Sequence, residues 1–312
     1  MIGRALVTGA SGFIGRALTT RLLNDGWSVI TVGRDATHNQ QPATEAVSVA
    51  RYDDATLENA LRGRQADVIF HLAAYGVAPG QRDPALMFDV NVAGPSAIVR
   101  AAKLVGARAV IYAGSSAEYV EAPNGMAIAE DYPLTTQALY GASKAAGGLW
   151  ARAVAAREGV AFQWLRVFGV YGPGEAPHRL LPAIITKLAR NEAVDLSPGN
   201  QIRDLLYIDD VISALILGAK AALAGEEGPF NLCSGQPVSV RDVAIALADA
   251  LGKPRTLLNF GAIPYRPDEN LWLLGDGTRL RQATDFQPRF YLTAGVRHFV
   301  ENFIPAHTEG TA

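Results

Sequence analysis

A glycine-rich turn near the N-terminus constrains the fold of this chain more than any other feature. The stretch Ala5–Arg16 reads ALVTGASGFIGR, an apolar strand followed by small residues and the start of an apolar-periodic helix. Gly9, Gly12 and Gly15 are spaced three apart. In a strand–turn–helix unit the first glycine permits the turn, the second admits a phosphate and the third allows close packing. The stretch therefore predicts a dinucleotide site at the helix N-terminus, with a purely structural turn as the alternative.

The composition excludes several classes of protein. Of the 312 residues, 49% are apolar and 19% charged, and the net charge of −2 gives no reason to expect a nucleic acid or membrane partner. The single cysteine, Cys233, excludes an internal disulfide and is expected to be a small buried residue. The apolar segment Val211–Leu223 is too short to span a bilayer, and the N-terminus lacks the plan of a signal peptide. We expect a cytoplasmic enzyme.

Predicted strands and helices alternate through the first half of the chain. This alternation predicts an α/β fold with a doubly wound parallel sheet and a smaller C-terminal substrate-binding domain. We assign residues 1–168 to the dinucleotide-binding domain, with a return to it around 203–224, and residues 169–312 mainly to the substrate-binding domain. After the opening strand, further strands are expected at Trp27–Val32, Asp67–His71, Arg108–Ala113, Val160–Val167, Leu205–Tyr207 and Phe230–Leu232. Helices are expected at Leu57–Leu61, Ala85–Val105, Ala138–Arg157, His178–Asn191, Asp209–Leu223, Ser239–Leu251 and Thr293–Phe303.

Three local signals refine these helices. Gly94-Pro95 should kink the helix Ala85–Val105, because proline lacks the N–H that a helix interior needs. Asp209 and Ser239 are candidate N-caps of the helices that they open.

The end of the second predicted strand bears on the choice of nicotinamide cofactor. An acidic residue there binds the ribose 2′-hydroxyl of NAD, whereas an arginine accommodates the 2′-phosphate of NADP. This strand ends in Gly33-Arg34, and Arg16 can add a second cation. NADP(H) is therefore favoured. Asp35 keeps NAD(H) open as the alternative, and Arg34 can also be a solvated loop arginine.

A tyrosine–lysine pair supplies candidate acid–base chemistry. Tyr140 and Lys144 lie four residues apart, so both side chains share one helix face. A free tyrosine has a pKa of roughly 10, and a nearby ammonium is expected to lower it toward neutral pH. Ser115 and Ser116 end the fourth predicted strand, where a hydroxyl can orient a substrate oxygen. The alternative for an isolated pair of this kind is a solvated surface.

In combination, these motifs resemble the extended short-chain dehydrogenase/reductase family, in particular its NAD(P)-dependent nucleotide-sugar epimerases, dehydratases and reductases. The resemblance covers nearly the whole chain and rests on Thr8–Gly15, His71–Ala74, Ser115–Tyr119, Tyr140–Lys144, Phe168–Pro173 and Arg203–Asp210. It implies that Ser116, Tyr140 and Lys144 are catalytic and that Asn91 supports the active site, unless Asn91 only satisfies a buried backbone group. The implied cofactor-binding residues are Gly9, Ser11, Gly12, Phe13, Ile14, Arg34, Asp53, Leu72, Ala73, Ala74, Tyr140 and Lys144. The implied substrate-binding residues are Ser115, Ser116, Arg179, Arg203 and Arg266.

Three departures from the family pattern narrow the reaction. Gly169 replaces a common asparagine, Ala117-Glu118 replaces the Asp-Glu of the dehydratases, and Arg34 replaces the acidic residue of NAD-dependent epimerases. They point to a reductase of a nucleotide-linked 4-keto-6-deoxy hexose, similar to CDP-abequose or CDP-paratose synthases. In that reaction NADPH delivers hydride to C4, Tyr140 donates the proton and Ser116 binds the same oxygen.

Two other functions remain open. The first is an NAD-dependent nucleotide-sugar C4 epimerase, and the second is a non-catalytic NADP(H)-sensing protein. The family resemblance also implies a homodimer formed through Ala85–Val105 and Ala138–Arg157.

Several polar and aromatic residues have a structural alternative. Tyr207 and Phe230 can stack a nucleotide base, although core packing is favoured, and Glu118 is expected to face solvent near the site. Arg179 is as consistent with a solvated helix face as with the substrate pocket. The five histidines show no metal-ligand spacing, so no metal is predicted; His71 is expected to satisfy local hydrogen bonds.

Overall fold

A seven-stranded parallel sheet forms the centre of the molecule. The computed structural model describes residues 3–34, 44–267 and 269–303. The strand order is β10-β6-β5-β4-β1-β2-β3, and every neighbouring pair is parallel. These strands are β1 (Arg4–Thr8), β2 (Ser28–Gly33), β3 (Thr44–Ser48), β4 (Val68–His71), β5 (Ala109–Ser115), β6 (Ala161–Val167) and β10 (Gly228–Leu232).

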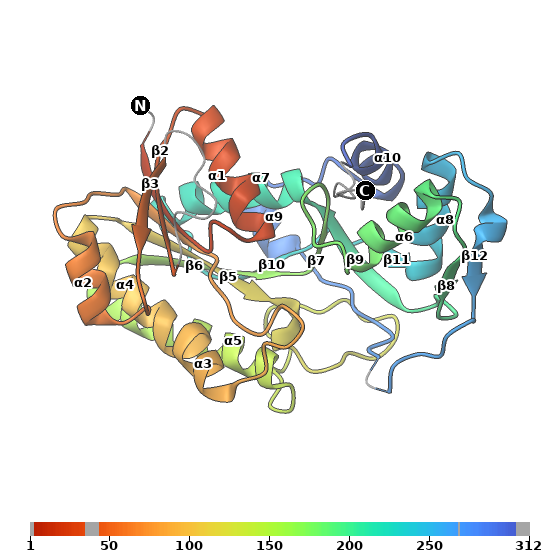
Figure 1. Cartoon of the computed structure of the whole chain (residues 1–312). Helices are drawn as coiled ribbons and strands as arrows, with labels where there is room; N and C mark the ends of the chain where they lie inside the picture. Colours follow the sequence, from red (N-terminus) through yellow and green to blue (C-terminus); the bar gives the residue numbers. More distant parts are fainter. Residues whose placement is uncertain (1–2, 35–43, 268, 304–312) are drawn as a thin grey trace.

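Helices cover both faces of this sheet (Figure 1). On one face α1 (Phe13–Asn24) packs against α7 (Ile208–Leu223). On the other face α4 (Gly94–Val105) packs against both α2 (Asp54–Leu61) and α5 (Leu139–Glu158). Each face has its own cluster of buried apolar residues. The chain is therefore a doubly wound α/β protein, as its sequence predicts.

The predicted strands of the first half are present because each contains several buried apolar residues. All four residues of β4 are at most 1% exposed, as expected for a strand covered by helices on both faces. The edge strand β3 was not predicted. Only one of its five residues is buried, so it has no continuous apolar run to reveal it.

The second half of the chain adds two small sheets and returns once to the large one. One small sheet has the order β11-β9-β7, and the other pairs β12 with β8. Their strands are β7 (Gly169–Tyr171), β8 (Val194–Leu196), β9 (Ile202–Tyr207), β11 (Pro237–Ser239) and β12 (Leu258–Phe260). The helices here are α6 (Leu180–Ala189), α8 (Val240–Ala250), α9 (Thr278–Thr284) and α10 (Leu292–Glu301). The segment that returns to the large sheet includes α7 and strand β10. It therefore extends beyond residue 224, where the predicted range 203–224 ends.

The helix predicted over 85–105 is interrupted by a wider turn. It divides into α3 (Pro84–Phe88), a π-helical turn at Asp89–Ala93, and α4. The π turn directly precedes Gly94-Pro95, where the sequence predicts an irregularity. A π turn is one way for a helix to accommodate a missing backbone donor.

One predicted helix cap is present and the other is wrong. The Ser239 side chain caps α8 by accepting a hydrogen bond from the backbone N–H of Asp242. Asp209 does not cap α7, because this helix begins at Ile208 and Tyr207 occupies the capping position. The Asp209 carboxylate lies in the first turn, where negative charge favours the helix dipole.

Within the described residues, no helix combines the length and the apolar character needed to cross a membrane.

Candidate active site at the strand ends

The glycine turn between β1 and α1 has the geometry of a phosphate-binding turn. Gly9 has a positive φ of 67°, and a Cβ there would lie 2.7 Å from the backbone of Leu72 and Ala73. A Cβ on Gly15 would lie 2.1 Å from the Gly9 carbonyl oxygen. Among the residues that the structure describes, no side chain caps α1 at Gly12. Its first N–H groups are therefore available to an anion.

The end of β2 has a glycine where a dinucleotide ribose is usually held by an acidic residue. Open space surrounds the position of a Cβ at Gly33, and Arg34 is exposed. Arg16 donates to the carbonyl oxygens of Ser11, at 2.8 Å, and Gly174, at 2.9 Å, and so ties the turn to the loop after β7. Asp35 lies outside the described residues.

Asp53 and His71 both have clear structural partners. The Asp53 carboxylate accepts a hydrogen bond of 2.8 Å from the Thr56 N–H, which caps α2 and lowers the Asp53 pKa. His71 Nδ1 lies 2.7 Å from the Thr8 hydroxyl, as expected of local hydrogen bonding. Burial lowers the His71 pKa to about 3, so this ring is neutral. Among the described residues, no group of three or more His, Cys, Asp or Glu side chains is arranged to hold a metal ion.

Tyr140 lies in the first turn of α5, and the Ser115 side chain acts on its phenol to lower the Tyr140 pKa. Burial acts in the opposite direction and raises the Tyr140 pKa to about 12. The expected lowering of this pKa is therefore wrong. The sequence shows that an ammonium is one helical turn away, but not how deeply the phenol is buried.

Lys144 is buried beneath the site. It is 2% exposed, and its Nζ lies 4.2 Å from the centroid of the Tyr112 ring. Burial lowers its pKa to about 8, and the charge of Glu118 opposes that change. The ammonium thus interacts with an aromatic face and a buried carboxylate.

Ser115 is the last residue of β5 and caps a short 3₁₀ turn at Ser116–Glu118. Its hydroxyl oxygen accepts a hydrogen bond of 3.1 Å from the Ala117 N–H. Of the two adjacent serines, Ser115 is the one that acts on the Tyr140 pKa. The catalytic use of Ser116 stays a prediction.

Asn91 satisfies buried backbone groups, which is one of the two functions that the sequence allows. Its Oδ1 accepts from the Tyr75 N–H at 2.9 Å, and its Nδ2 donates to the Tyr75 carbonyl at 2.8 Å. Nδ2 also donates to the Ser143 hydroxyl at 3.0 Å. Asn91 thereby satisfies buried backbone groups and fixes the segment after β4 against α5.

The three candidate arginines differ in their partners and in their exposure. Arg203 forms an ion pair with Glu269 and donates to two backbone carbonyls, so its guanidinium is largely occupied. Arg179 lies 3.6 Å from Glu175, is 56% exposed and acts electrostatically on Tyr140. Arg266 is exposed.

The favoured core assignments agree with the structure. Tyr207 and Phe230 are 1% and 4% exposed, and the Tyr207 ring packs against Tyr171 and Phe290. Cys233 is buried, as predicted.

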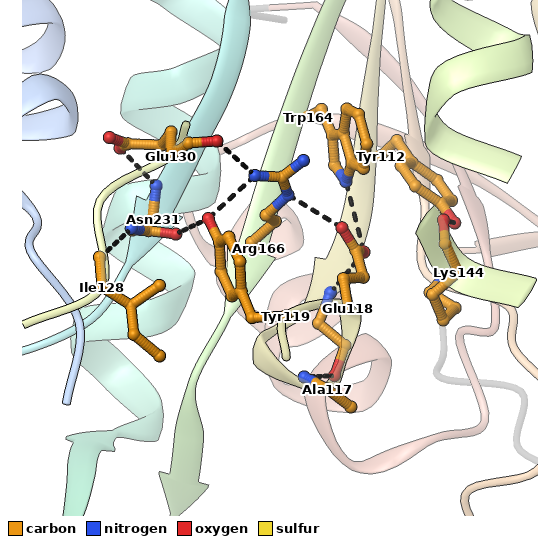
Figure 2. Close-up of polar contacts among 11 residues, drawn as sticks. Tyr112, Ala117, Glu118, Tyr119, Ile128, Glu130, Lys144, Trp164, Arg166 and Asn231 are labelled. Atoms are coloured by element: carbon orange, nitrogen blue, oxygen red, sulfur yellow. Dashed lines mark hydrogen bonds and ion pairs between the residues drawn. The ribbon is translucent and has the colours of Figure 1, made fainter. Parts of the chain in front are cut away.

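Glu118 does not face solvent, and this prediction is wrong. The side chain is fully buried, and its Oε2 accepts from Arg166 Nε at 2.8 Å (Figure 2). Sequence reasoning missed this ion pair. The available signal was Arg166 itself, because a charged residue in a buried strand needs a buried partner.

The fold and this site define a known class of enzyme. Residues 5–233 match the NAD dependent epimerase/dehydratase family, and the chain belongs to that family. It is an NAD(P)-dependent enzyme of the nucleotide-sugar epimerase/dehydratase type.

Individual relatives cover almost the whole chain. The chain is 30% identical to the UDP-glucose 4-epimerase of Mycolicibacterium smegmatis, over 96% of this chain and 98% of the relative. It is 26% identical to the CDP-abequose synthase of Salmonella typhimurium, over 95% of this chain and 97% of the relative. Among solved structures, the Thermus thermophilus UDP-glucose 4-epimerase in complex with NAD is 28% identical to this chain, with a TM-score of 0.83. The match covers 96% of this chain and 98% of the epimerase chain.

Proposed function

We propose that the protein is an NADPH-dependent reductase of the C4 keto group of a nucleotide-linked 4-keto-6-deoxy hexose. The observation that carries this proposal is the end of β2, where Gly33 leaves open space and Arg34 is exposed. A guanidinium here suits the 2′-phosphate of NADP, whereas an NAD-specific site needs a carboxylate. NADPH supplies hydride when bound, and this preference suits a reaction that consumes reduced cofactor.

The protonation state of Tyr140 supports reduction. Because burial raises its pKa to about 12, the phenol carries its proton at neutral pH and can donate it to a developing alkoxide. In this proposal a hydroxyl of the Ser115-Ser116 pair binds the same substrate oxygen; Ser115 is the serine that acts on the Tyr140 pKa. Lys144 holds the nicotinamide ribose in this proposal.

The substrate diphosphate is assigned to Arg203 and Arg266, and Arg179 is assigned to the lining of the substrate pocket. Their guanidinium groups suit paired hydrogen bonds to phosphate. Arg203 must share its donors between the substrate and Glu269. Of the three, Arg179 is the one whose charge acts on Tyr140.

A nucleotide-sugar C4 epimerase with bound NAD is the second candidate. It is favoured by the similarity to the M. smegmatis relative, whose name is UDP-glucose 4-epimerase. An epimerase regenerates its cofactor in each cycle, so it needs no net supply of reductant.

A substrate screen separates the two candidates. The purified protein is incubated with NADPH and with UDP-, dTDP-, CDP- and GDP-linked 4-keto sugars. A reductase oxidises one NADPH for each sugar reduced. The proposal is overturned if nicotinamide remains bound through gel filtration and UDP-glucose is converted to UDP-galactose without net oxidation.

A further inference from the structure

Glu118 belongs to a buried polar network that reaches the candidate active site. Its Oε2 accepts from Arg166, while its Oε1 accepts from the Ser115 N–H at 2.8 Å and from Trp164 Nε1 at 3.3 Å (Figure 2). All of these donors are protein groups, and the side chain is 0% exposed. A buried carboxylate with three donors has a fixed position.

The network holds Glu118 from the side away from the site. Arg166 Nη1 donates to the Tyr119 hydroxyl and to the Glu130 carbonyl oxygen, both at 2.8 Å. The Tyr119 hydroxyl in turn lies 2.6 Å from Asn231 Oδ1. The guanidinium therefore cannot turn away from Glu118 without breaking several other hydrogen bonds.

On the other side, Glu118 contacts the groups that act in the proposed reaction. With Ser115 it forms a capping box, in which the serine hydroxyl accepts from the turn and the carboxylate accepts from the serine N–H. This fixes the residue whose side chain acts on the Tyr140 phenol. The carboxylate also interacts electrostatically with the buried Lys144.

We propose that Glu118 is a positioning residue, which fixes Ser115 at the end of β5 and presents a carboxylate to the buried Lys144. The inference rests on the proposed use of Ser115, Tyr140 and Lys144 and extends it to a residue that touches neither substrate nor cofactor. Arg166 pairs with this carboxylate at 2.8 Å and opposes the rise in the Glu118 pKa that burial causes.

The charged and titratable groups around Glu118 and Lys144 determine in which direction the loss of Glu118 changes the Lys144 pKa. Glu118 faces Ser115 and Tyr112 of β5, Trp164 and Arg166 of β6, and Tyr140 and Lys144 of α5. Lys144 faces Tyr112, His71 and Glu118. Of the groups around Lys144, Glu118 alone is an anion when ionised at neutral pH. Its removal must therefore lower the Lys144 pKa below its value of about 8.

The test compares Glu118→Gln with the wild-type protein and with Glu130→Gln. Glu130 is a matched control, because its buried carboxylate accepts from the Asn231 N–H in the same network without contacting Ser115. Affinity for NADPH and for NADH is measured by fluorescence from neutral to alkaline pH. In Glu118→Gln, the pH at which affinity falls should decrease by about one unit, while Glu130→Gln should match the wild type.

A second variant separates the loss of the anion from the exposure of an unpaired cation. Glu118→Gln with Arg166→Met removes both charges and leaves no buried ion without a partner. The same acidic shift is expected in this double variant. If its profile returns to that of the wild type, the effect comes from the unpaired Arg166 and the inference is overturned.

The activity of Glu118→Gln on the sugar substrate that the screen identifies tests the positioning of Ser115 independently. Displacement of Ser115 should lower kcat about tenfold at the optimal pH, with little change in the KM for the sugar. If the pH at which NADPH affinity falls is the same in Glu118→Gln as in the wild type, the inference is overturned, even if NADPH oxidation is observed. If no 4-keto sugar is reduced, the reductase proposal fails, while cofactor binding still decides the question of Glu118.

Discussion

Tyr140 is the residue on which the proposed chemistry depends. Tyr140→Phe removes the proton donor while it retains the ring, so NADPH affinity should stay close to that of the wild type. The rate of sugar reduction should fall by about 10²–10⁴-fold. Single-turnover kinetics with saturating NADPH measure this loss directly. A variant with near-normal turnover would show that another group supplies the proton.

The two adjacent serines make a matched pair of variants. Because the Ser115 side chain acts on the Tyr140 phenol, Ser115→Ala should reduce kcat by about 10²-fold, through loss of an oriented donor to the substrate oxygen. Ser116→Ala should reduce it less. The family motif favours Ser116, so the opposite ranking of the two kcat values would restore that assignment.

Arg34 offers a direct test of cofactor choice. Arg34→Ala should weaken NADPH binding by about tenfold or more and leave NADH affinity nearly unchanged, because only NADPH carries the 2′-phosphate. Titration calorimetry with both cofactors measures the ratio. Arg4→Ala serves as the control. Arg4 is an exposed arginine at the start of β1, and its side chain donates to Gln65. Equal losses for the two cofactors in Arg34→Ala would exclude 2′-phosphate recognition.

At the scale of single elements, β6 contains a buried amide with no compensating contact. Gln163 is 0% exposed, and neither its Oε1 nor its Nε2 has a hydrogen-bond partner among the described residues. Gln163→Met keeps the unbranched shape and removes the polar atoms. It should raise the free energy of unfolding by about 1 kcal/mol.

Urea denaturation measures this change, and Gln201→Met is the matched control. Gln201 is also buried, but its Nε2 donates to the Ser197 hydroxyl at 3.2 Å, so its replacement loses a hydrogen bond. Its substitution should therefore gain less stability or lose some. A destabilised Gln163→Met would indicate that the amide is hydrogen-bonded, for example to buried water.

The elements that could be predicted are those specified by local patterns. The glycine triplet, the apolar strands and the Tyr140/Lys144 spacing each lie within a few neighbouring residues, and the structure contains all of them. The Glu118–Arg166 pair joins residues 48 apart, so no local pattern reveals it. The raised Tyr140 pKa has the same origin, because burial depends on the tertiary fold.

At the scale of the whole molecule, the helical face formed by α3, α4 and α5 carries exposed apolar side chains. Phe88, Leu104, Leu149 and Trp150 are between 42% and 59% exposed. We propose that this face forms a homodimer, as the family resemblance implies, because large apolar residues gathered on paired helices are typical of such interfaces.

A matched pair of leucines tests this assembly. Leu149 on α5 is 55% exposed, and Leu271, which lies near the start of β9, is 45% exposed. Leu149→Glu places a charge within the proposed interface and should convert the dimer to a monomer, because an unpaired charge is costly to bury there. Leu271→Glu should leave the dimer intact. Light scattering after gel filtration gives the mass of each variant. If the wild type is a monomer, or if Leu149→Glu remains a dimer, this face is not the interface.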